Sequence, residues 1–178
     1  MSRAIFAVDT TARSRKWRAF LACGRTLLAL LVLLGSQSAS ADPVKADQAL
    51  QFADIQYQTF KLYYQTGKQL VLSGQIEAAR VNFQAAHLQT VMLNIDLQQL
   101  SLENVDSLQN GQCNDCNLQQ QAVTYSQFAQ VDSMVLQLHL ANLSQTPTSQ
   151  ASMSQADLQI ILLDLDLQQA EYYTHAAQ

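Results

Sequence analysis

Two closely spaced cysteines, Cys113 and Cys116, are the side chains with the most specific chemistry in this sequence. They stand in the order Cys-Asn-Asp-Cys. In an oxidising compartment such a pair forms a disulfide that closes a short loop. A redox-active thiol pair is the alternative, because a cysteine near a helix N-terminus has a lowered pKa. The strand-then-helix context of most redox pairs is missing here, so the sequence favours the disulfide.

Asp96 and Asp166 are a second candidate, because they occupy the same place in two similar stretches of the chain. Paired carboxylates can act as a general acid and a general base. The sequence places no nucleophile, oxyanion donor or substrate-binding arginine beside them. We therefore expect half-exposed helix carboxylates and a protein that is not an enzyme.

The histidines offer little for metal binding. His87, His139 and His175 are scattered, and none forms a Glu-x-x-His pair or another ligand spacing typical of a metal site. The sequence therefore predicts neither a metal site nor a cofactor.

The stretches that carry Asp96 and Asp166 reveal an internal duplication. Residues 88–99 read LQTVMLNIDLQQ and residues 158–169 read LQIILLDLDLQQ, seven identical positions at an offset of 70 residues. Upstream, Tyr57-x-x-Phe60 resembles Tyr125-x-x-Phe128 at an offset of 68. We interpret the chain as two homologous helical hairpins, with about two residues inserted in the second turn.

Apolar residues recur at spacings of three and four along both halves, which indicates amphipathic helices. The expected helices cover about 45–73, 75–109 and 118–143. A fourth begins at Thr146-Pro147, or at Ser152 or Ser154, and ends near His175. Hairpin 1 is thus about 45–110, the loop 111–117 and hairpin 2 about 118–176. The fold class is all-α, with two antiparallel hairpins that form a four-helix bundle or a repeat-like helical array.

The duplicated helices are apolar on two faces. Leu88, Val91 and Ile95 fall on one side, and Leu93 and Leu97 fall nearly opposite, with the same arrangement in the second copy. One face must serve the core. The other needs a second cover, which the opposite hairpin, a second subunit or a partner protein would provide.

The first 41 residues have the pattern of a signal peptide. Basic residues precede a short apolar run at 27–34, and Ala39-Ser40-Ala41 resembles a cleavage site before Asp42. The run is far shorter than the roughly 20 residues that span a membrane. We expect a periplasmic or secreted domain of residues 42–178 without stable membrane insertion. Retention of the leader as an anchor is the alternative.

Removal of the leader makes the chain strongly acidic. Four basic and thirteen acidic residues remain, a formal net charge of −9. Such a surface repels nucleic acid. It suits a basic partner or a divalent cation, and it also simply favours solubility.

Residues 60–93 carry small and aromatic side chains in a characteristic spacing: Tyr63, Gly67, Gly74, Ala79, Phe83 and Ala86. This segment resembles a tetratricopeptide repeat, a helical hairpin of about 34 residues that usually serves protein binding. The resemblance implies that Gly67 and Ala79 lie where two helices approach closely and that Gly74 makes the turn. The second hairpin keeps only Ala156 of this pattern.

These observations predict an exported helical domain for protein–protein interaction or scaffolding, without catalytic activity. A basic peptide is one form its protein partner could take. The candidate partner-binding residues are Tyr63, Tyr64, Asn82 and Gln89. A self-associating structural subunit of an envelope assembly and a Cys-x-x-Cys redox protein are the alternatives.

Overall fold

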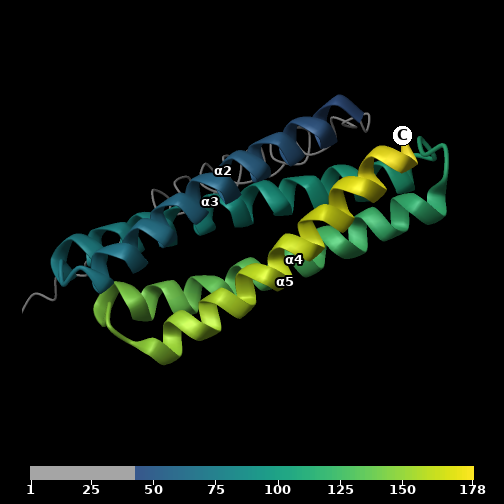
Figure 1. The fold of residues 1–178 in the computed structure, drawn as a ribbon. Helices are drawn as coiled ribbons and strands as arrows, with labels where there is room; N and C mark the ends of the chain where they lie inside the picture. The colour runs from purple at the N-terminus through teal and green to yellow at the C-terminus, as the bar shows by residue number, and fades with distance from the viewer. Residues whose placement is uncertain (1–42) are drawn as a thin grey trace, which may run out of the picture. The chain divides into compact units, whose positions relative to one another are not determined.

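The structure is a computed structural model that describes residues 43–178, all within one compact unit. The predicted signal peptide, residues 1–41, lies outside the described residues. The described chain forms the helices α2 (Pro43–Leu72), α3 (Ile76–Gln109), α4 (Cys116–Gln145) and α5 (Gln150–Ala177) (Figure 1). The all-α prediction is confirmed.

The helices of this unit are antiparallel to their chain neighbours and enclose a common core. α3 packs closely against α2 and α4, and α4 packs closely against α5. The backbones of α2 and α5 approach each other at few points, and long side chains bridge them instead. Two hairpins, α2–α3 and α4–α5, therefore form a four-helix bundle with three tight seams and one wider one.

Glycines follow the C-termini of α2 and α3. Gly74 has φ 76°, and the N–H of Gln75 donates to the carbonyl oxygen of Leu70 at 2.9 Å. Gly111 has φ 63°, and the N–H of Gln112 donates to the carbonyl oxygen of Ser107 at 3.0 Å. Both are left-handed C-caps that satisfy terminal carbonyls, as predicted for Gly74.

The N-termini of α4 and α5 begin at capping side chains. Asp115 accepts hydrogen bonds from the N–H groups of Asn117 and Leu118, so α4 begins two residues earlier than the sequence indicated. Ser149 accepts from the N–H of Ser152, so α5 begins at Gln150 and not at any of the expected starts. Pro147 lies in the preceding turn. A side-chain cap thus outweighed proline in setting this boundary.

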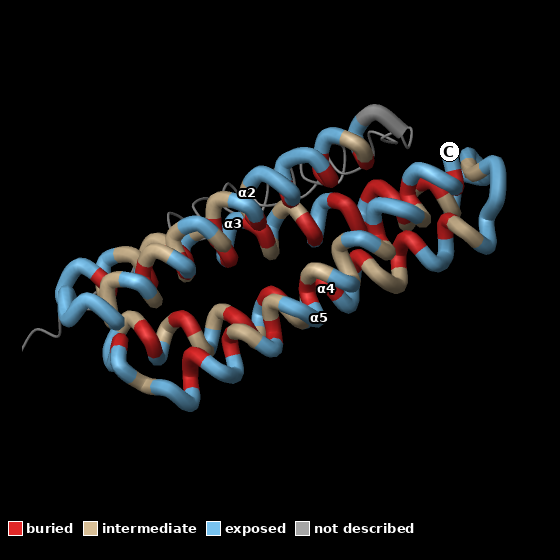
Figure 2. The backbone as a smooth tube through the Cα atoms, in the orientation of Figure 1, coloured by how far each residue is buried: buried red, intermediate tan, exposed pale blue. Residues whose placement is uncertain are grey.

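The core follows a seven-residue repeat in which positions a and d are buried (Figure 2). On α3 the a and d positions run from Ala79 and Phe83 to Asn104 and Ser107 in alternating steps of four and three, and Ser101 and Glu103 next to them are buried as well. Gly67 faces Phe83 so closely that an added Cβ would lie 2.7 Å from the ring atom Cε1. The close helix approach expected at Gly67 is therefore present.

The two-faced character of the duplicated helices is also confirmed. Leu93, Leu97 and Leu163 are fully buried, whereas Leu88 and Leu158 are 63% and 60% exposed. An offset of 70 residues relates six of the eight buried positions of α5 to buried positions of α3.

The duplication between α2 and α4 differs from the sequence prediction. Phe60 is fully buried, but its predicted counterpart Phe128 is 52% exposed. Ala129 occupies the buried position instead. The aromatic match between the two helices is therefore one residue out of register with the core, because α4 turns its small residues inward.

A buried polar network joins three helices near the loop between the hairpins. The side-chain amide of Gln119 donates to Oδ1 of Asn104 at 2.6 Å, and Nδ2 of Asn104 donates to Oγ1 of Thr174 at 3.2 Å. All three residues are buried. Each of these three side chains finds a partner, so the network costs little stability and favours one alignment of α3, α4 and α5.

Candidate functional site

Cys113 and Cys116 form a disulfide, with their Cα atoms 5.2 Å apart. The favoured interpretation from the sequence is therefore confirmed. The N–H of Asn114, inside the bridged loop, donates to the carbonyl oxygen of Ala177 at 3.1 Å. The disulfide and this hydrogen bond tie the loop between the hairpins to the end of α5.

The four residues predicted to bind a partner do not share one surface. Tyr64 is fully buried, and its hydroxyl lies 2.8 Å from Asp157 Oδ1 and 3.0 Å from the Met153 carbonyl oxygen. Tyr63, Asn82 and Gln89 are half-buried at heptad positions that border the α2–α3 seam. Asn82 donates to the carbonyl oxygen of Ala78. Partner binding by this set stays a prediction, and the position of Tyr64 gives it a part in packing α2 against α5.

The wider seam between α2 and α5 carries a ladder of polar contacts at seven-residue intervals. In the first rung, Lys68 Nζ contacts both carboxylate oxygens of Asp157 at 2.7 Å and lies 5.3 Å from the centre of the Tyr64 ring. The ammonium thus bridges an aromatic face and a carboxylate. This rung closes the seam near the turns that end α2 and begin α5.

The second rung repeats the first. Lys61 Nζ lies 4.3 Å from the centre of the Tyr57 ring and 3.8 Å from Asp164 Oδ1. The Tyr57 hydroxyl donates towards the Ile160 carbonyl oxygen at 3.4 Å. Each of these two rungs therefore contains a tyrosine on α2, a lysine four residues later and an aspartate on α5.

The third rung breaks the pattern. Leu50 stands in place of the tyrosine, Asp54 in place of the lysine, and Glu171 is the acid on α5. Asp54 accepts a hydrogen bond from Gln58, and Glu171 makes no hydrogen bond or ion pair with another described residue. Here each helix contributes an acid to the seam, and no lysine of the described chain occupies the position equivalent to Lys61 and Lys68.

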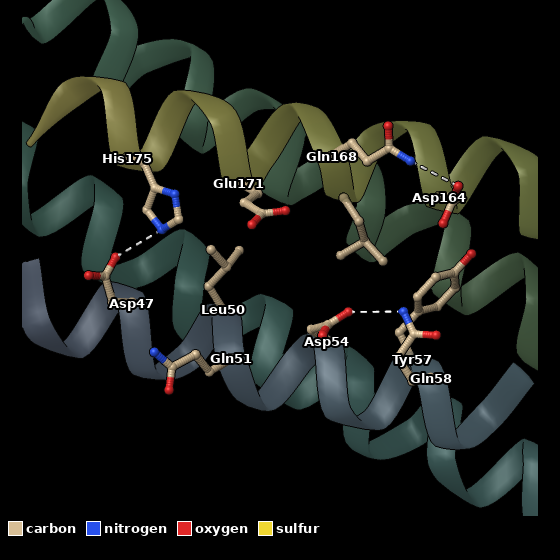
Figure 3. A pocket seen from close by; sticks show the side chains of 11 residues that line it. Asp47, Leu50, Gln51, Asp54, Tyr57, Gln58, Asp164, Gln168, Glu171 and His175 are labelled. Carbon is tan, nitrogen blue, oxygen red and sulfur yellow. Dashed lines mark hydrogen bonds and ion pairs between the residues drawn. The ribbon is translucent and has the colours of Figure 1, made fainter.

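A groove of about 510 Å³ opens at this unmatched rung (Figure 3). Leu50, Tyr57 and Leu167 supply apolar surface, and acids from both helices line the sides. His175 at the far end lies 3.4 Å from Asp47. The residues that line the groove are Asp47, Leu50, Gln51, Asp54, Tyr57, Gln58, Asp164, Leu167, Gln168, Glu171 and His175.

Burial and neighbouring carboxylates keep both bridging tyrosines protonated. Burial raises the pKa of the Tyr57 hydroxyl, and the hydrogen bond and charge of Asp164 raise it further. The pKa of Tyr64 is raised in the same way by burial and by Asp157. The hydroxyls therefore act as fixed hydrogen-bond donors in the α2–α5 seam.

The duplicated acids lie away from the groove, on half-buried helix positions. Burial raises the pKa of Asp96. Burial also raises the pKa of Asp166, to about 6, with the hydrogen bond and charge of Asp132 adding to the effect. Asp132 itself accepts from Gln159 at 2.7 Å. Asp166 therefore interacts across the α4–α5 seam with Asp132, whereas burial alone accounts for the raised pKa of Asp96.

The groove was missed at the level of sequence, although a signal for it was present. Tyr-x-x-x-Lys occurs twice, seven residues apart, at Tyr57 and Tyr64. Acids follow the same interval at Asp157, Asp164 and Glu171. When tyrosine–lysine pairs on one helix and acids on an antiparallel helix both recur every seven residues, they are expected to form a ladder of contacts. Asp54 stands where the next lysine would be, which marks the position of the groove.

Comparison with known proteins gives no relative to argue from. No protein-family model, no curated protein and no solved structure matches the chain. No helix in the described range 43–178 is long and apolar enough to cross a membrane. Within that same range, no group of three or more His, Cys, Asp or Glu side chains is arranged to hold a metal ion.

Proposed function

We propose that the protein is an exported helical interaction domain that binds a cationic segment of a partner protein in the groove between α2 and α5. It acts by binding and not by catalysis. The observation that carries the proposal is the third rung of the ladder, where Asp54 on α2 and Glu171 on α5 both line the groove and no lysine takes the place of Lys61 or Lys68.

The first two rungs support a cationic ligand at the third. In both, a lysine ammonium sits between an aromatic ring and a carboxylate on the opposite helix. A lysine or arginine side chain from a partner would occupy the equivalent place between Asp54 and Glu171. Its aliphatic stem would lie on the apolar floor at Leu50 and Leu167.

A cationic peptide also fits the shape and the charge of the groove better than a small ion does. The groove is elongated along two helices and lined by amides and apolar side chains as well as acids. The expected net charge of −9 after removal of the leader would steer a basic partner to this surface.

The redox alternative is less well supported by the surroundings of the disulfide. Asp115 places its carboxylate at the start of α4 and accepts the hydrogen bonds of Asn117 and Leu118. Those N–H groups would otherwise stabilise a thiolate at Cys116. A negative charge beside that sulfur disfavours the low thiol pKa that redox catalysis uses. We therefore assign the disulfide a structural role.

Calorimetric titration with a pair of synthetic peptides tests the proposal. One is a short amphipathic helix with arginines on its polar face, and the other carries citrulline, the uncharged isostere, in their place. The arginine peptide should bind, and the citrulline peptide should bind at least about tenfold more weakly, because charge-assisted hydrogen bonds contribute roughly 1.5–3 kcal/mol. Equal affinity of the two peptides would contradict the proposal.

Two variants localise the binding to the groove. Glu171→Gln should weaken the arginine peptide by about tenfold, and Asp54→Lys should abolish binding by supplying the missing cation from within. Glu77→Gln is the matched control, since Glu77 is an exposed helix acid on α3 outside the groove. If Glu77→Gln weakens binding as much as Glu171→Gln, the attraction is a general charge effect and the groove is not the site.

A further inference from the structure

The bundle has a second distinctive surface on the side formed by α3 and α4. Large apolar side chains stand exposed on the outward positions of both helices. Their central members are Leu88, Val91 and Ile95 on α3 and Val131, Met134 and Leu138 on α4. We refer to this surface as the α3–α4 face.

The α3–α4 face is continuous because the two helices are joined by a tight, polar seam. Nδ2 of Asn94 donates to Oγ of Ser133 at 2.8 Å, and the amide of Gln137 donates to the carbonyl oxygen of Thr90 at 3.0 Å. These contacts join the outward apolar positions of the two helices side by side.

The same face carries no formal charge over most of its length. Between residues 81 and 105, the outward heptad positions b, c, e and f of α3 hold no Asp, Glu, Lys or Arg. The corresponding positions of α4 hold none from Cys116 to Gln145. The single acid of α4, Asp132, points to α5, where it contacts Gln159.

We infer that the α3–α4 face binds the same face of a second copy, so that the protein forms a symmetric dimer. The charge distribution selects this occupant. A chain with thirteen acids and four bases beyond its leader carries a net negative charge that repels its own copies. Over residues 81–105 of α3 and the length of α4, two copies would meet through the α3–α4 face without bringing acids at outward positions together.

The available area is sufficient for a stable pair. Two adjacent helices of about 30 residues are each about 45 Å long and about 10 Å wide, so together they present roughly 900 Å². A standard stable interface needs about 800 Å² on each partner. Glutamine side chains interleave with the apolar ones on both helices and would supply hydrogen bonds across the interface.

A lipid surface fits the same face less well. Helices that lie in a membrane interface usually carry lysine and arginine on their polar side, which attract anionic headgroups. α4 has no lysine or arginine, and the one arginine of α3, Arg80, is paired with Glu77. The expected occupant is therefore protein, and the matching surface at hand is the chain itself.

Sedimentation equilibrium of the purified protein over a micromolar concentration series tests the dimer. The wild type should sediment as a dimer. Val91→Asp and Met134→Asp should each shift the monomer–dimer midpoint at least tenfold upward, because each places two like charges in a symmetric interface. Helical circular dichroism and the melting profile confirm that the variants fold.

Matched variants on the other side of the bundle control for nonspecific effects. Ile55→Asp on α2 and Leu162→Asp on α5 also replace exposed apolar residues with an acid, and they should leave the midpoint unchanged. A wild type that is monomeric throughout overturns the inference, and so does a folded Met134→Asp that still forms dimers. Co-sedimentation of monomers with phosphatidylcholine vesicles would also overturn it, in favour of a lipid occupant. Peptide binding in the groove is unaffected by these variants, so this result is separate from the test of the proposed function.

Discussion

The two long sides of this bundle are built from the same duplicated sequence but have opposite surface chemistry. The α3–α4 side is a tight seam of small and amide side chains with an uncharged, apolar exterior. The α2–α5 side is a wide seam bridged by tyrosines and lysines, with an acidic groove at one end. If the duplication had kept its symmetry, the two sides would be equivalent. Their difference shows that the copies diverged at the seams while the heptad core was preserved.

The size of the inward-facing residues explains the different widths. α2 turns Tyr57, Phe60 and Tyr64 into the core, with neighbouring ring centres 6.0 Å apart. α4 turns Ser126, Ala129 and Ser133 inward. Large residues keep α5 at a distance from α2, whereas small residues let α3 approach α4. The acidic groove is a consequence of the wider seam, at the point where Leu50 replaces a tyrosine.

Removal of a ring from the wide seam should have the largest effect. Phe60→Ala should lower the free energy of unfolding by roughly 3–5 kcal/mol, because it leaves a cavity in a fully buried site. Phe128→Ala, at the duplicated but exposed position, should change it by less than about 0.5 kcal/mol. Urea denaturation measures both. Similar losses at the two sites would mean that the seams are equivalent after all.

Loss of one hydroxyl should have a smaller effect that is also specific to the wide seam. Tyr64→Phe should cost roughly 1–3 kcal/mol, because Asp157 and the Met153 carbonyl oxygen lose a buried donor. Tyr63→Phe on the same helix is the control, since no hydrogen bond joins that hydroxyl to another described residue. Thermal unfolding of the pair should show a lower Tm for Tyr64→Phe alone.

Completion of the ladder should make the wide seam more stable. Asp54→Lys places a lysine at the third rung on α2, where it should form an exposed ion pair with Glu171 worth roughly 0.2–1 kcal/mol. The Tm should rise, and the rise should shrink in high salt because exposed charges are screened. A Tm that falls would show that Asp54 has a favourable role in the free protein.

The acid pair on the α4–α5 seam should give a modest pH dependence unrelated to the groove. The pKa of Asp166 is near 3.8 in the unfolded chain and is raised to about 6 in the fold. Burial is the largest cause of this increase, and the hydrogen bond and charge of Asp132 add to it. Because its pKa is raised in the fold, Asp166 makes a contribution to the free energy of unfolding that is fully present below about pH 4. This contribution is lost as the pH rises through about 6. Asp166→Asn should raise the urea midpoint at neutral pH and flatten this dependence.

Asp132→Asn should also reduce the dependence of the urea midpoint on pH, because it removes the charge and the hydrogen bond that add to the raised pKa of Asp166. Glu77→Gln should leave this dependence unchanged. An unchanged profile in Asp166→Asn would assign the pH dependence to other carboxylates.

The sequence predicted the elements of the fold well because they depend on local patterns. Apolar spacing located the helices, and the turn expected at Gly74 is present, since a left-handed cap favours glycine. The two faces of the repeat helices followed from Leu88 and Leu93 falling on opposite sides. The start of α5 was wrong because the serine cap at Ser149 competes with Pro147, and a sequence alone does not rank the two.

The candidate site was harder to predict because it depends on a contact between distant helices. Asp54 and Glu171 are 117 positions apart, and their meeting depends on the α2–α5 alignment, which no local pattern sets. The choice of Tyr64 as a surface residue had the same weakness, because an amphipathic tyrosine suits a core edge and an interface equally. The aromatic match between Phe60 and Phe128 also hid the one-residue change in the core register.

The buried contacts of α3 decide which of two charge-compatible alignments the bundle adopts. If α5 slid by one heptad along α2, Lys61 would face Glu171 and Lys68 would face Asp164, so both lysines would still be paired. In that alignment Asp54 would no longer oppose an acid. The ladder is therefore degenerate, and electrostatics alone would not select the observed arrangement. Gly67 packs directly against Phe83, and this contact sets the position of α2 along α3. The hydrogen bond between Asn104 and Thr174 sets the position of α5 along α3. Together they exclude the slipped alignment and preserve an acidic gap that the helix charges on their own would have closed.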